Sequence, residues 1–528
     1  MATHHPSLAQ EPSNLIGGTW SAIPGGTVRS INPARPDEVV WSGSPTVCAV
    51  GDAVQAARGA APAWASMPVH DRESVLRRFQ ALCTERQGVI ADLIRDETGK
   101  VPWDARQEAA LLVSKVEITL DDSPESPRRR VLPFGVSVSA TRQGRAWFRP
   151  HGVMAVIGPY NFPMHLPNGH IVPALLMGNT IVFKPSDKAP GCGQMLAELF
   201  QEALDHAGAP SGVFNLVQGG PDVASAMAAH PGLDGILFTG SWPVGRRILE
   251  ANLDRPSRLI ALEMGGNNPA VVMDDADLVL ALAECVRSAF ITTGQRCTCT
   301  RRIIVHERIA DRFIGAVCRA AEALVIGDPR SDGPVFMGPI ISDEARRNVL
   351  EYQSGLRRAG AEVLLESRGK DLPGMGWYVT PGVIRVNGFH NGSPVRGPGS
   401  PEFDAGCDME VFGPVVRVCV VRSLDEAIRQ ANATNFGLAA AIFTGDSSAA
   451  ERFALECRAG CVNVNCGTAG ASSRLPFGGL GLSGNHRPAG AFSLDSCAYP
   501  VAGLFESGSE APPVPGMTID PSWLKSRG

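Results

Sequence analysis

The sequence lacks a strong excess of charge of either sign. Its net charge is −5 over 528 residues, and its densest basic cluster is the short run Arg128-Arg129-Arg130, which is typical of a solvated turn. Proteins that bind nucleic acid or charged membrane surfaces usually carry a pronounced basic face. The composition therefore argues against nucleic acid and membranes as partners.

The sequence also lacks an apolar stretch long enough to span a bilayer, and residues 1–20 lack the apolar core of a secretory leader. Its thirteen cysteines are scattered and are not paired at the spacings of a disulfide framework. Free thiols are typical of a reducing compartment, so we expect a cytoplasmic protein. Cys297-x-Cys299 and Cys461-x4-Cys466 have no matching Cys/His pairs at zinc-site spacing, so we expect no metal site.

Glycine and proline, in contrast, are plentiful, with 58 and 41 copies. Together with a hydrophobic content of 44%, they suit a large α/β enzyme with many strand-to-helix turns. A chain of 528 residues exceeds one ordinary domain, so we expect two or three.

Strands alternate with helices from residue 151 onward, which predicts a doubly wound parallel sheet. The expected strands are 153–157, 180–184, 214–218, 236–239 and 259–263. Such sheets bind ligands at the carboxyl ends of their strands.

The alternation restarts after residue 265, which predicts a second α/β domain over residues 265–485. We assign the first domain to residues 1–130 and 151–264, with residues 1–15 frayed. Residues 507–528 are rich in Ser, Glu and Pro and are expected to form a flexible tail.

Several polar or charged residues follow the predicted strands of the first domain, namely Asn161, Lys184, Gly240-Ser241 and Glu263. Because the carboxyl ends of parallel strands meet at one edge, we expect these residues to lie near one another. Each alone also has an ordinary structural explanation, such as a turn residue or a solvated charge. Their joint placement favours a functional site.

Two further features are ambiguous when read alone. Gly240-Ser-Trp-Pro-Val-Gly245 is not the usual G-x-G-x-x-G fingerprint, but it offers a helix N-terminus to a diphosphate. Cys297 lies on a polar turn, residues 292–300, between a predicted helix at 277–290 and a predicted strand at 303–305. A thiol there could be a nucleophile, and the same description fits an inert cysteine.

Seven motifs in sequence order resemble those of the NAD(P)-dependent aldehyde dehydrogenase superfamily, over essentially the whole chain. They are Pro159-Tyr-Asn-Phe-Pro163, Lys184-Pro-Ser-Asp187, Phe238-Thr-Gly-Ser241, Leu262-Glu-Met-Gly-Gly266, Gly294-Gln-Arg-Cys297, Glu410-Val-Phe-Gly-Pro414 and Pro476-Phe-Gly-Gly479.

Three of these regions are more specifically similar to succinylglutamate-semialdehyde dehydrogenases of arginine catabolism. They are Gly158 to Pro173, Leu262 to Pro269 and Gly294 to Cys299, joined by Ser483-Gly-Asn-His-Arg-Pro488. This resemblance implies oxidation of N-succinylglutamate 5-semialdehyde to N-succinylglutamate. Motifs indicate reaction type better than substrate, so another semialdehyde or an aliphatic aldehyde stays open.

The resemblance assigns catalytic roles to three residues. Cys297 would attack the aldehyde as a thiolate and form first a thiohemiacetal and then a thioester. The Asn161 amide and the Cys297 backbone N–H would hold the oxyanion, and Glu263 would activate the water that hydrolyses the thioester. The presence of Glu263 argues against a reductase or a coenzyme-A-acylating member. A catalytically silent binding paralogue is the rival from another class.

The resemblance also implies a cofactor site. Lys184 and Glu410 would hold the riboses, Gly240, Ser241 and Gly245 would approach the diphosphate, and Phe412 would pack beside the nicotinamide. The remaining expected cofactor residues are Ser186, Asp187 and Gly219. Asp187 stands where the family often carries Glu, and a shorter carboxylate still disfavours a 2′-phosphate, so NAD is expected and NADP stays open.

A dicarboxylated substrate requires cationic anchors, and arginine suits carboxylates best. Arg296, Arg301 and Arg487 lie near the catalytic motifs in sequence, and each also has a plausible structural role as an ion-pair partner. Cys299 is expected to be a bystander, because the Gly-Gln-x-Cys register selects Cys297.

The resemblance finally implies an oligomerisation ribbon built from residues 131–150 and 486–506. A homodimer or a homotetramer is expected, and the sequence does not choose between them.

Overall fold

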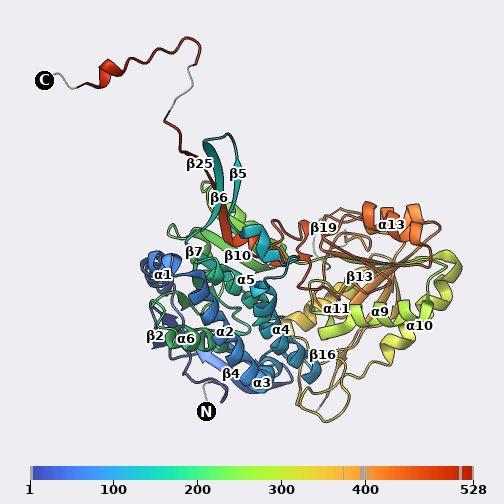
Figure 1. Cartoon of the computed structure of the whole chain (residues 1–528). Helices are drawn as coiled ribbons and strands as arrows, with labels where there is room; N and C mark the ends of the chain where they lie inside the picture. The colour runs from blue at the N-terminus through green and yellow to red at the C-terminus, as the bar shows by residue number, and fades with distance from the viewer. Residues whose placement is uncertain are drawn as a thin grey trace.

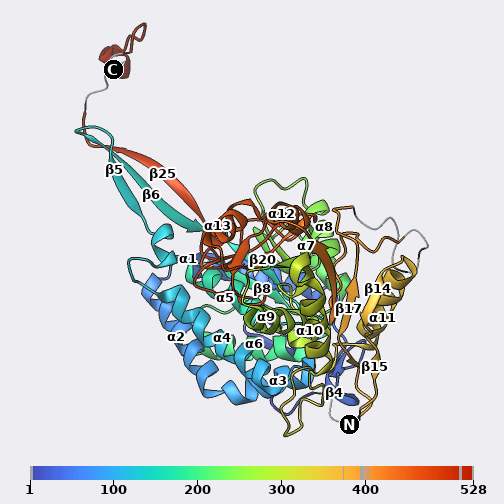
Figure 2. The same ribbon diagram turned by 90° about the vertical axis from the view of Figure 1, so that its right-hand side faces the viewer.

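The computed structural model describes residues 4–372, 374–392, 398, 400, 403–509 and 514–525. The chain forms two α/β units side by side and a narrow β-ribbon that projects from the first (Figures 1 and 2). No helix among these residues is long and apolar enough to cross a membrane.

The first unit contains a seven-stranded sheet in the order β11-β10-β7-β8-β9-β1-β2. The five strands from β11 to β9 in this order are parallel, and β1 and β2 extend the sheet antiparallel beyond β9. The strands are β1 (Ser13–Ile16), β2 (Thr19–Ala22), β7 (Val153–Ile157), β8 (Thr180–Lys184), β9 (Phe214–Leu216), β10 (Gly235–Gly240) and β11 (Leu259–Met264).

Helices cover both faces of this sheet because the apolar residues of its strands alternate between two cores. Met154 and Val156 face one core, and Val153, Ala155 and Ile157 face the other. The first core is covered by α2 (Val69–Glu85), α3 (Gln87–Thr98), α4 (Pro102–Leu120), α5 (His165–Leu176) and α6 (Pro190–His206). The second is covered by α1 (Ala49–Ser66), α7 (Pro221–Ala229) and α8 (Trp242–Glu250).

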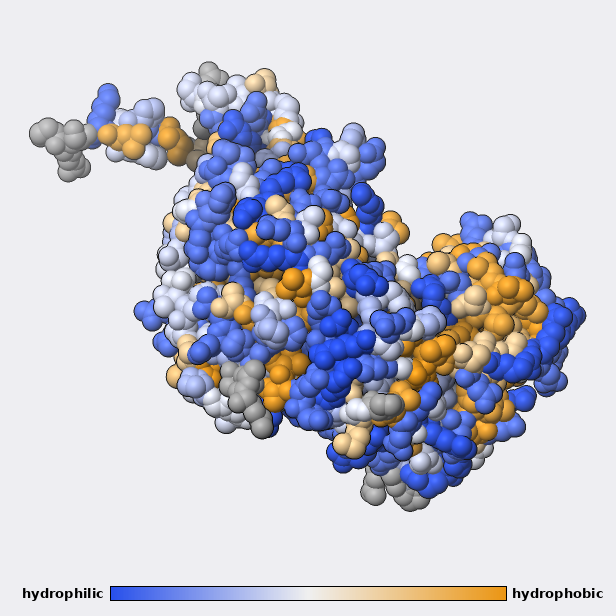
Figure 3. All heavy atoms as spheres, turned by 90° about the horizontal axis from the view of Figure 1, so that it is seen from below, coloured by the Kyte–Doolittle hydropathy of each residue, from blue (hydrophilic) through white to orange (hydrophobic). Residues whose placement is uncertain are grey.

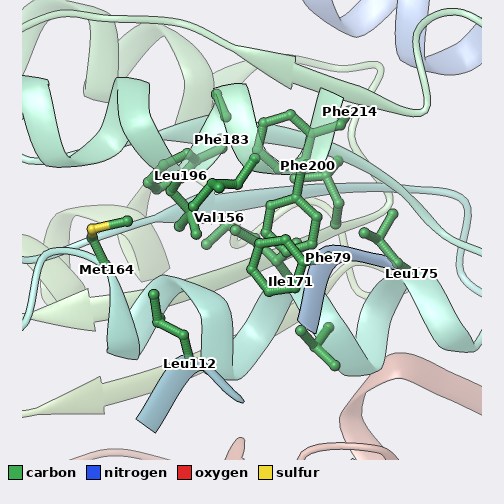
Figure 4. Close-up of a cluster of buried hydrophobic side chains, with 14 of the residues drawn as sticks. Phe79, Leu112, Val156, Met164, Ile171, Leu175, Phe183, Leu196, Phe200 and Phe214 are labelled. Atoms are coloured by element: carbon green, nitrogen blue, oxygen red, sulfur yellow. The ribbon is translucent and has the colours of Figure 1, made fainter. Parts of the chain in front are cut away.

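Aromatic stacking closes the first core (Figure 4). The rings of Phe79 on α2 and Phe200 on α6 stack with centroids 3.8 Å apart, and Phe200 in turn stacks on Phe214 of β9 at 5.1 Å. This contact fixes the helical layer onto the strands that end at the candidate site.

The second unit contains a seven-stranded sheet in the order β14-β17-β18-β13-β12-β20-β21, parallel except for β14. Its strands are β12 (Asn268–Val272), β13 (Thr300–His306), β14 (Glu362–Leu365), β17 (Gly382–Arg385), β18 (Val415–Val421), β20 (Ala439–Phe443) and β21 (Cys461–Val464). Its helices are α9 (Leu278–Phe290), α10 (Ala310–Glu322), α11 (Asp343–Arg358), α12 (Leu424–Ala431) and α13 (Ser447–Glu456).

The ribbon consists of β5 (Phe134–Ser137), β6 (Arg142–Pro150) and β25 (Ala498–Glu506), all antiparallel. Within residues 486–506 only β25 belongs to it, since Leu494 and Cys497 pack in the first core. The predicted tail, 507–528, lies partly outside the described residues. Its described part stands clear of the body and exposes hydrophobic side chains, visible at the upper left of Figure 3.

The remaining elements are short. They are the pairs β3 (Val28–Asn32) with β4 (Arg35–Gly43), β15 (Gly369–Lys370) with β16 (Tyr378–Val379), β19 (Phe436–Gly437) with β23 (Leu480–Gly481), and β22 (Pro476–Phe477) with β24 (Ala489–Gly490). The 3-10 turns are η1 (Pro127–Val131), η2 (Ile291–Gly294), η3 (Glu307–Ile309), η4 (Asp495–Cys497) and η5 (Pro521–Leu524).

The predicted fold class is confirmed, with a doubly wound parallel sheet, a second α/β unit and a small β-ribbon. The prediction that residues 1–15 are frayed is wrong for residues 4–15, and residues 1–3 lie outside the described residues. Leu15 is fully buried, and β1 pairs with β9 and β2. The segment is held largely by polar contacts, such as the Gln218 N–H donating to the Asn14 side chain at 2.8 Å, which hydrophobic patterning does not reveal.

Candidate active site

The predicted nucleophile loop is folded into an unusual backbone conformation. Thr292 and Thr293 have φ of 53° and 55°, a left-handed region that β-branched residues rarely occupy. Gly294 follows with φ of 71°, and a Cβ there would lie 2.2 Å from the Gly413 carbonyl oxygen. Cys297, three residues on, is half-buried.

Two asparagines hold this loop against the rest of the site. The Asn161 amide donates to the Gln295 carbonyl at 3.0 Å, which brings the residue predicted to hold the oxyanion beside the nucleophile loop. The Asn268 amide donates to the carbonyls of Cys297 at 2.8 Å and Cys299 at 2.9 Å. Asn268 was not among the predicted site residues, although it lies two residues after the Glu-Met-Gly-Gly motif.

Glu263 lies near the end of β11, beside Gly484, with which it forms an isolated bridge. Its side chain is buried, and neither carboxylate oxygen has a hydrogen-bond partner among the described residues. Burial therefore raises the pKa of the Glu263 carboxyl well above its ordinary value. A buried, unpartnered carboxyl is costly, which is typical of a functional group.

The pKa of the Cys297 thiol is also raised well above its ordinary value. Burial is the largest cause, and the nearby carboxylates of Glu263 and Glu410 add to it, while Arg296 acts in the opposite direction. The resting thiol is therefore protonated at neutral pH. Cys299 is fully buried, and its thiol faces the Ile291 carbonyl at 3.7 Å.

Two residues, a lysine and a glutamate, could bind a polar ligand. Lys184, at the end of β8, is buried, and its ammonium makes no hydrogen bond or ion pair with any described residue; burial lowers its pKa to about 8. Glu410 accepts from the Gly266 N–H at 3.1 Å, and burial raises its pKa to about 7. A cation and a carboxylate with unused capacity fit the hydroxyls of a dinucleotide.

The other predicted cofactor residues surround Lys184 and the start of α8. The Ser186 hydroxyl accepts from the Lys188 N–H at 3.2 Å, and the Asp187 carboxylate acts on the pKa of Lys184. Ser241 is the N-cap of α8, and its hydroxyl caps no helix N–H. The Phe412 ring meets that of Tyr160 edge-on at 6.1 Å.

Packing alone accounts for glycine at three of the predicted cofactor positions. A Cβ at Gly219 would lie 2.3 Å from Val223, one at Gly240 2.4 Å from the Phe238 ring, and one at Gly245 2.3 Å from the Met264 sulfur. Their lack of a side chain is therefore not in itself evidence of a diphosphate.

Two of the three candidate substrate arginines are occupied by protein partners. Arg296 pairs with Asp104 at 2.7 Å, and Arg301 donates to the carbonyls of Gly413 at 3.1 Å and Arg296 at 3.0 Å.

Arg487 differs from both, since it makes no hydrogen bond or ion pair with any residue that the structure describes. A Cβ built on Gly478 would lie 2.6 Å from the Arg487 Cα and 3.2 Å from the Glu263 Oε2. The backbone of Arg487 and the carboxylate of the candidate base therefore both lie close to Gly478.

The model of the aldehyde dehydrogenase family matches residues 20–500. The chain belongs to the aldehyde dehydrogenase family. The predicted enzyme class, an NAD(P)-dependent aldehyde dehydrogenase, is thereby confirmed.

Among its relatives, the enzyme is 42% identical over 493 residues to N-succinylglutamate 5-semialdehyde dehydrogenase 2 of Caulobacter vibrioides, covering 92% of this chain and 95% of that one. It is 43% identical to the N-succinylglutamate 5-semialdehyde dehydrogenase of Sphingopyxis alaskensis, covering 90% and 93%. The structure of an NAD-dependent aldehyde dehydrogenase from Sinorhizobium meliloti superposes with a TM-score of 0.85 at 28% identity, covering 97% and 98%.

Proposed function

We propose that this aldehyde dehydrogenase oxidises N-succinylglutamate 5-semialdehyde to N-succinylglutamate with NAD. Relatives carrying that name match it at 42–43% identity over at least 90% of both chains. The observation that carries the hydrolytic part of the proposal is the buried, unpartnered carboxyl of Glu263, whose raised pKa suits a general base.

The reaction follows from three side chains. The Cys297 thiol first gives its proton to water, and the thiolate sulfur then adds to the aldehyde carbon. The carbonyl oxygen becomes an oxyanion held by the Asn161 amide and the Cys297 N–H. Loss of hydride converts the thiohemiacetal into a thioester. Glu263 then takes a proton from water, whose oxygen attacks the thioester carbon; the carbon–sulfur bond breaks, and the acid leaves with Cys297 released as the thiolate.

The cofactor would lie along the ends of β8 and β10, held by Lys184, Ser186, Asp187 and Glu410 and by the start of α8 at Ser241, with Phe412 beside its nicotinamide. When bound, NAD accepts the hydride. The Asp187 carboxylate would repel a 2′-phosphate, so NAD is preferred over NADP.

Arg487 is the proposed anchor for a substrate carboxylate, because its guanidinium has no partner among the described residues, whereas Arg296 pairs with Asp104 and Arg301 donates to two backbone carbonyls. A planar guanidinium binds a carboxylate through two parallel hydrogen bonds. Arg487→Gln is expected to raise KM for a carboxylated semialdehyde and to leave KM for an uncharged aldehyde of similar length unchanged.

Steady-state kinetics across a panel of semialdehydes and aliphatic aldehydes, each with NAD and with NADP, tests the substrate. We expect the highest kcat/KM for N-succinylglutamate 5-semialdehyde with NAD. A higher kcat/KM for another aldehyde overturns the substrate assignment, and a lack of turnover with every aldehyde by folded, NAD-binding protein favours a silent paralogue.

The ribbon suits assembly of this chain with further copies. Its exposed apolar side chains, Phe134, Val136, Val138 and Leu504, are between 53% and 68% exposed, which is unusual for strands facing water. We infer a homodimer or homotetramer joined through the ribbon. All thirteen cysteines are free, which suits the cytoplasm.

A further inference from the structure

Helix α4 (Pro102–Leu120) carries neither the proposed nucleophile nor the proposed base, yet it directs two buried carboxylates at the site. Asp104 and Glu108 are each 0% exposed. They are four residues apart, so they lie one above the other on one face of the helix.

Asp104 holds the loop that carries Cys297. One of its oxygens accepts from the Arg296 guanidinium at 2.7 Å, and the other accepts from the Thr292 hydroxyl at 2.6 Å. Arg296 closes the ring by donating from Nε to the same hydroxyl at 2.8 Å. Arg296 directly precedes Cys297, and Thr292 is one of the two left-handed threonines.

Glu108 holds a second part of the site, the segment that leads from Asn161 into α5. It accepts from the backbone N–H groups of Met164 and His165, both at 3.1 Å, and pairs with Lys100 at 2.5 Å.

The Phe162 ring, next to Asn161, joins the two sides. It lies 3.5 Å from the Lys100 ammonium and 5.0 Å from the centre of the Arg296 guanidinium. Helix α4 therefore holds both the loop that carries Cys297 and the loop that carries Asn161.

We propose that Asp104 is a positioning residue that acts through Arg296 to hold Cys297 opposite Asn161; this rests on the proposed thiol chemistry. A buried ion pair adds little net stability, since desolvation of its charges offsets their attraction. Left-handed threonines persist only where neighbouring contacts hold them. Asp104 supplies that restraint at the position where a displacement of the thiol is most harmful.

A double-mutant cycle tests this proposal. Asp104→Asn, Arg296→Gln and the double variant are compared for kcat, for KM and for the rate at which iodoacetamide alkylates Cys297 in the absence of aldehyde and NAD. Asp104→Asn is expected to lower kcat by about 10- to 100-fold with little change in KM, because small displacements of reacting groups are costly. The alkylation rate is expected to change as well. The kcat of the double variant is expected to be no lower than that of the less active single variant.

Glu117→Gln is the matched control, because it removes a carboxylate from the exposed face of the same helix. If Asp104→Asn does not fold, Thr292→Val removes the hydroxyl and keeps the ion pair, and it is expected to lower kcat in the same direction. Additive losses in the cycle, or an unchanged alkylation rate, overturn the proposal. Because alkylation needs neither substrate nor cofactor, a failure of the proposed function is seen separately, as native enzyme that alkylates normally and oxidises no aldehyde.

Discussion

At the scale of the residue, Glu263 shows how function opposes stability. Its carboxyl is buried and has no hydrogen-bond partner in the part of the chain that the structure describes, and this environment favours the neutral form. Yet the proposed reaction needs it to accept a proton. The same burial that makes Glu263 basic therefore makes its ionised form costly for the fold.

Glu263→Gln is expected to stabilise the protein at neutral pH by about 1–3 kcal/mol. In the unfolded chain the carboxyl ionises near its ordinary pKa of 4.5, while in the folded chain it keeps its proton to higher pH. The free energy of unfolding of the native protein therefore falls as pH rises above that value. Denaturant unfolding at several pH values measures the difference, which should shrink toward acid pH; a difference independent of pH would contradict this explanation.

The raised pKa of the Cys297 thiol predicts an alkaline rise in activity. kcat/KM reports the ionisation of groups in the free enzyme, and the resting thiol is protonated at neutral pH. We expect kcat/KM to increase between about pH 6 and about pH 9. A flat profile over that interval would show that ionisation of the thiol does not limit attack.

Asn161→Ala tests the oxyanion site. Loss of one preorganised donor is expected to lower kcat by about 100- to 1000-fold while KM changes little. Stopped-flow measurement of NADH formation separates the chemical step from product release. An unchanged rate of hydride transfer would assign the oxyanion to other donors.

At the scale of the element, the connection between β11 and β12 packs closely against the Glu410 side chain. A Cβ at Gly265 would lie 1.8 Å from the Glu410 carboxylate, so Gly265→Ala must displace it. The dissociation constant for NAD is expected to rise about tenfold, the effect of losing one hydrogen bond to a charged group. Fluorescence titration with NAD measures it, and Gly59→Ala, where a Cβ meets nothing within 4 Å, is the control. Equal affinity of both variants for NAD would show that Glu410 does not bind the cofactor.

Local elements were predictable because their signals are local. The strand predicted at 180–184 is β8, and the helix predicted at 277–290 is α9, Leu278–Phe290, capped by Asp277. The motifs also predicted that Asn161 and Cys297 lie in loops, and in the structure these two loops are in contact through the Asn161 side chain.

The partners of those elements were not predictable. Asp104 and Arg296 are 192 residues apart, and no local pattern links them. Asp104 and Glu108 appear in the sequence as polar interruptions of an apolar helix, which alone does not show what they bind. Arg296, a candidate substrate anchor in the sequence, pairs with Asp104 in the structure.

At the scale of the whole molecule, the ribbon is the feature that a single chain does not explain. Val136 on the edge strand β5 is 55% exposed within an apolar surface. Val136→Glu is expected to lower the oligomeric state, since burying a charge at a subunit interface is costly. Light scattering after size-exclusion chromatography measures the mass, and Val279→Glu, which alters an 80% exposed valine on α9, is the control. An unchanged mass would place the interface elsewhere.

In the proposed reaction, aldehyde oxidation passes through a thioester on Cys297 that Glu263 hydrolyses. Rapid mixing of Glu263→Gln enzyme with NAD and N-succinylglutamate 5-semialdehyde, followed by intact-protein and peptide mass spectrometry, tests it most directly. We predict a burst of NADH near one equivalent per active site, followed by slow turnover, with an N-succinylglutamyl group on Cys297. Steady turnover without a burst, or an acyl group on any other residue, would contradict this mechanism.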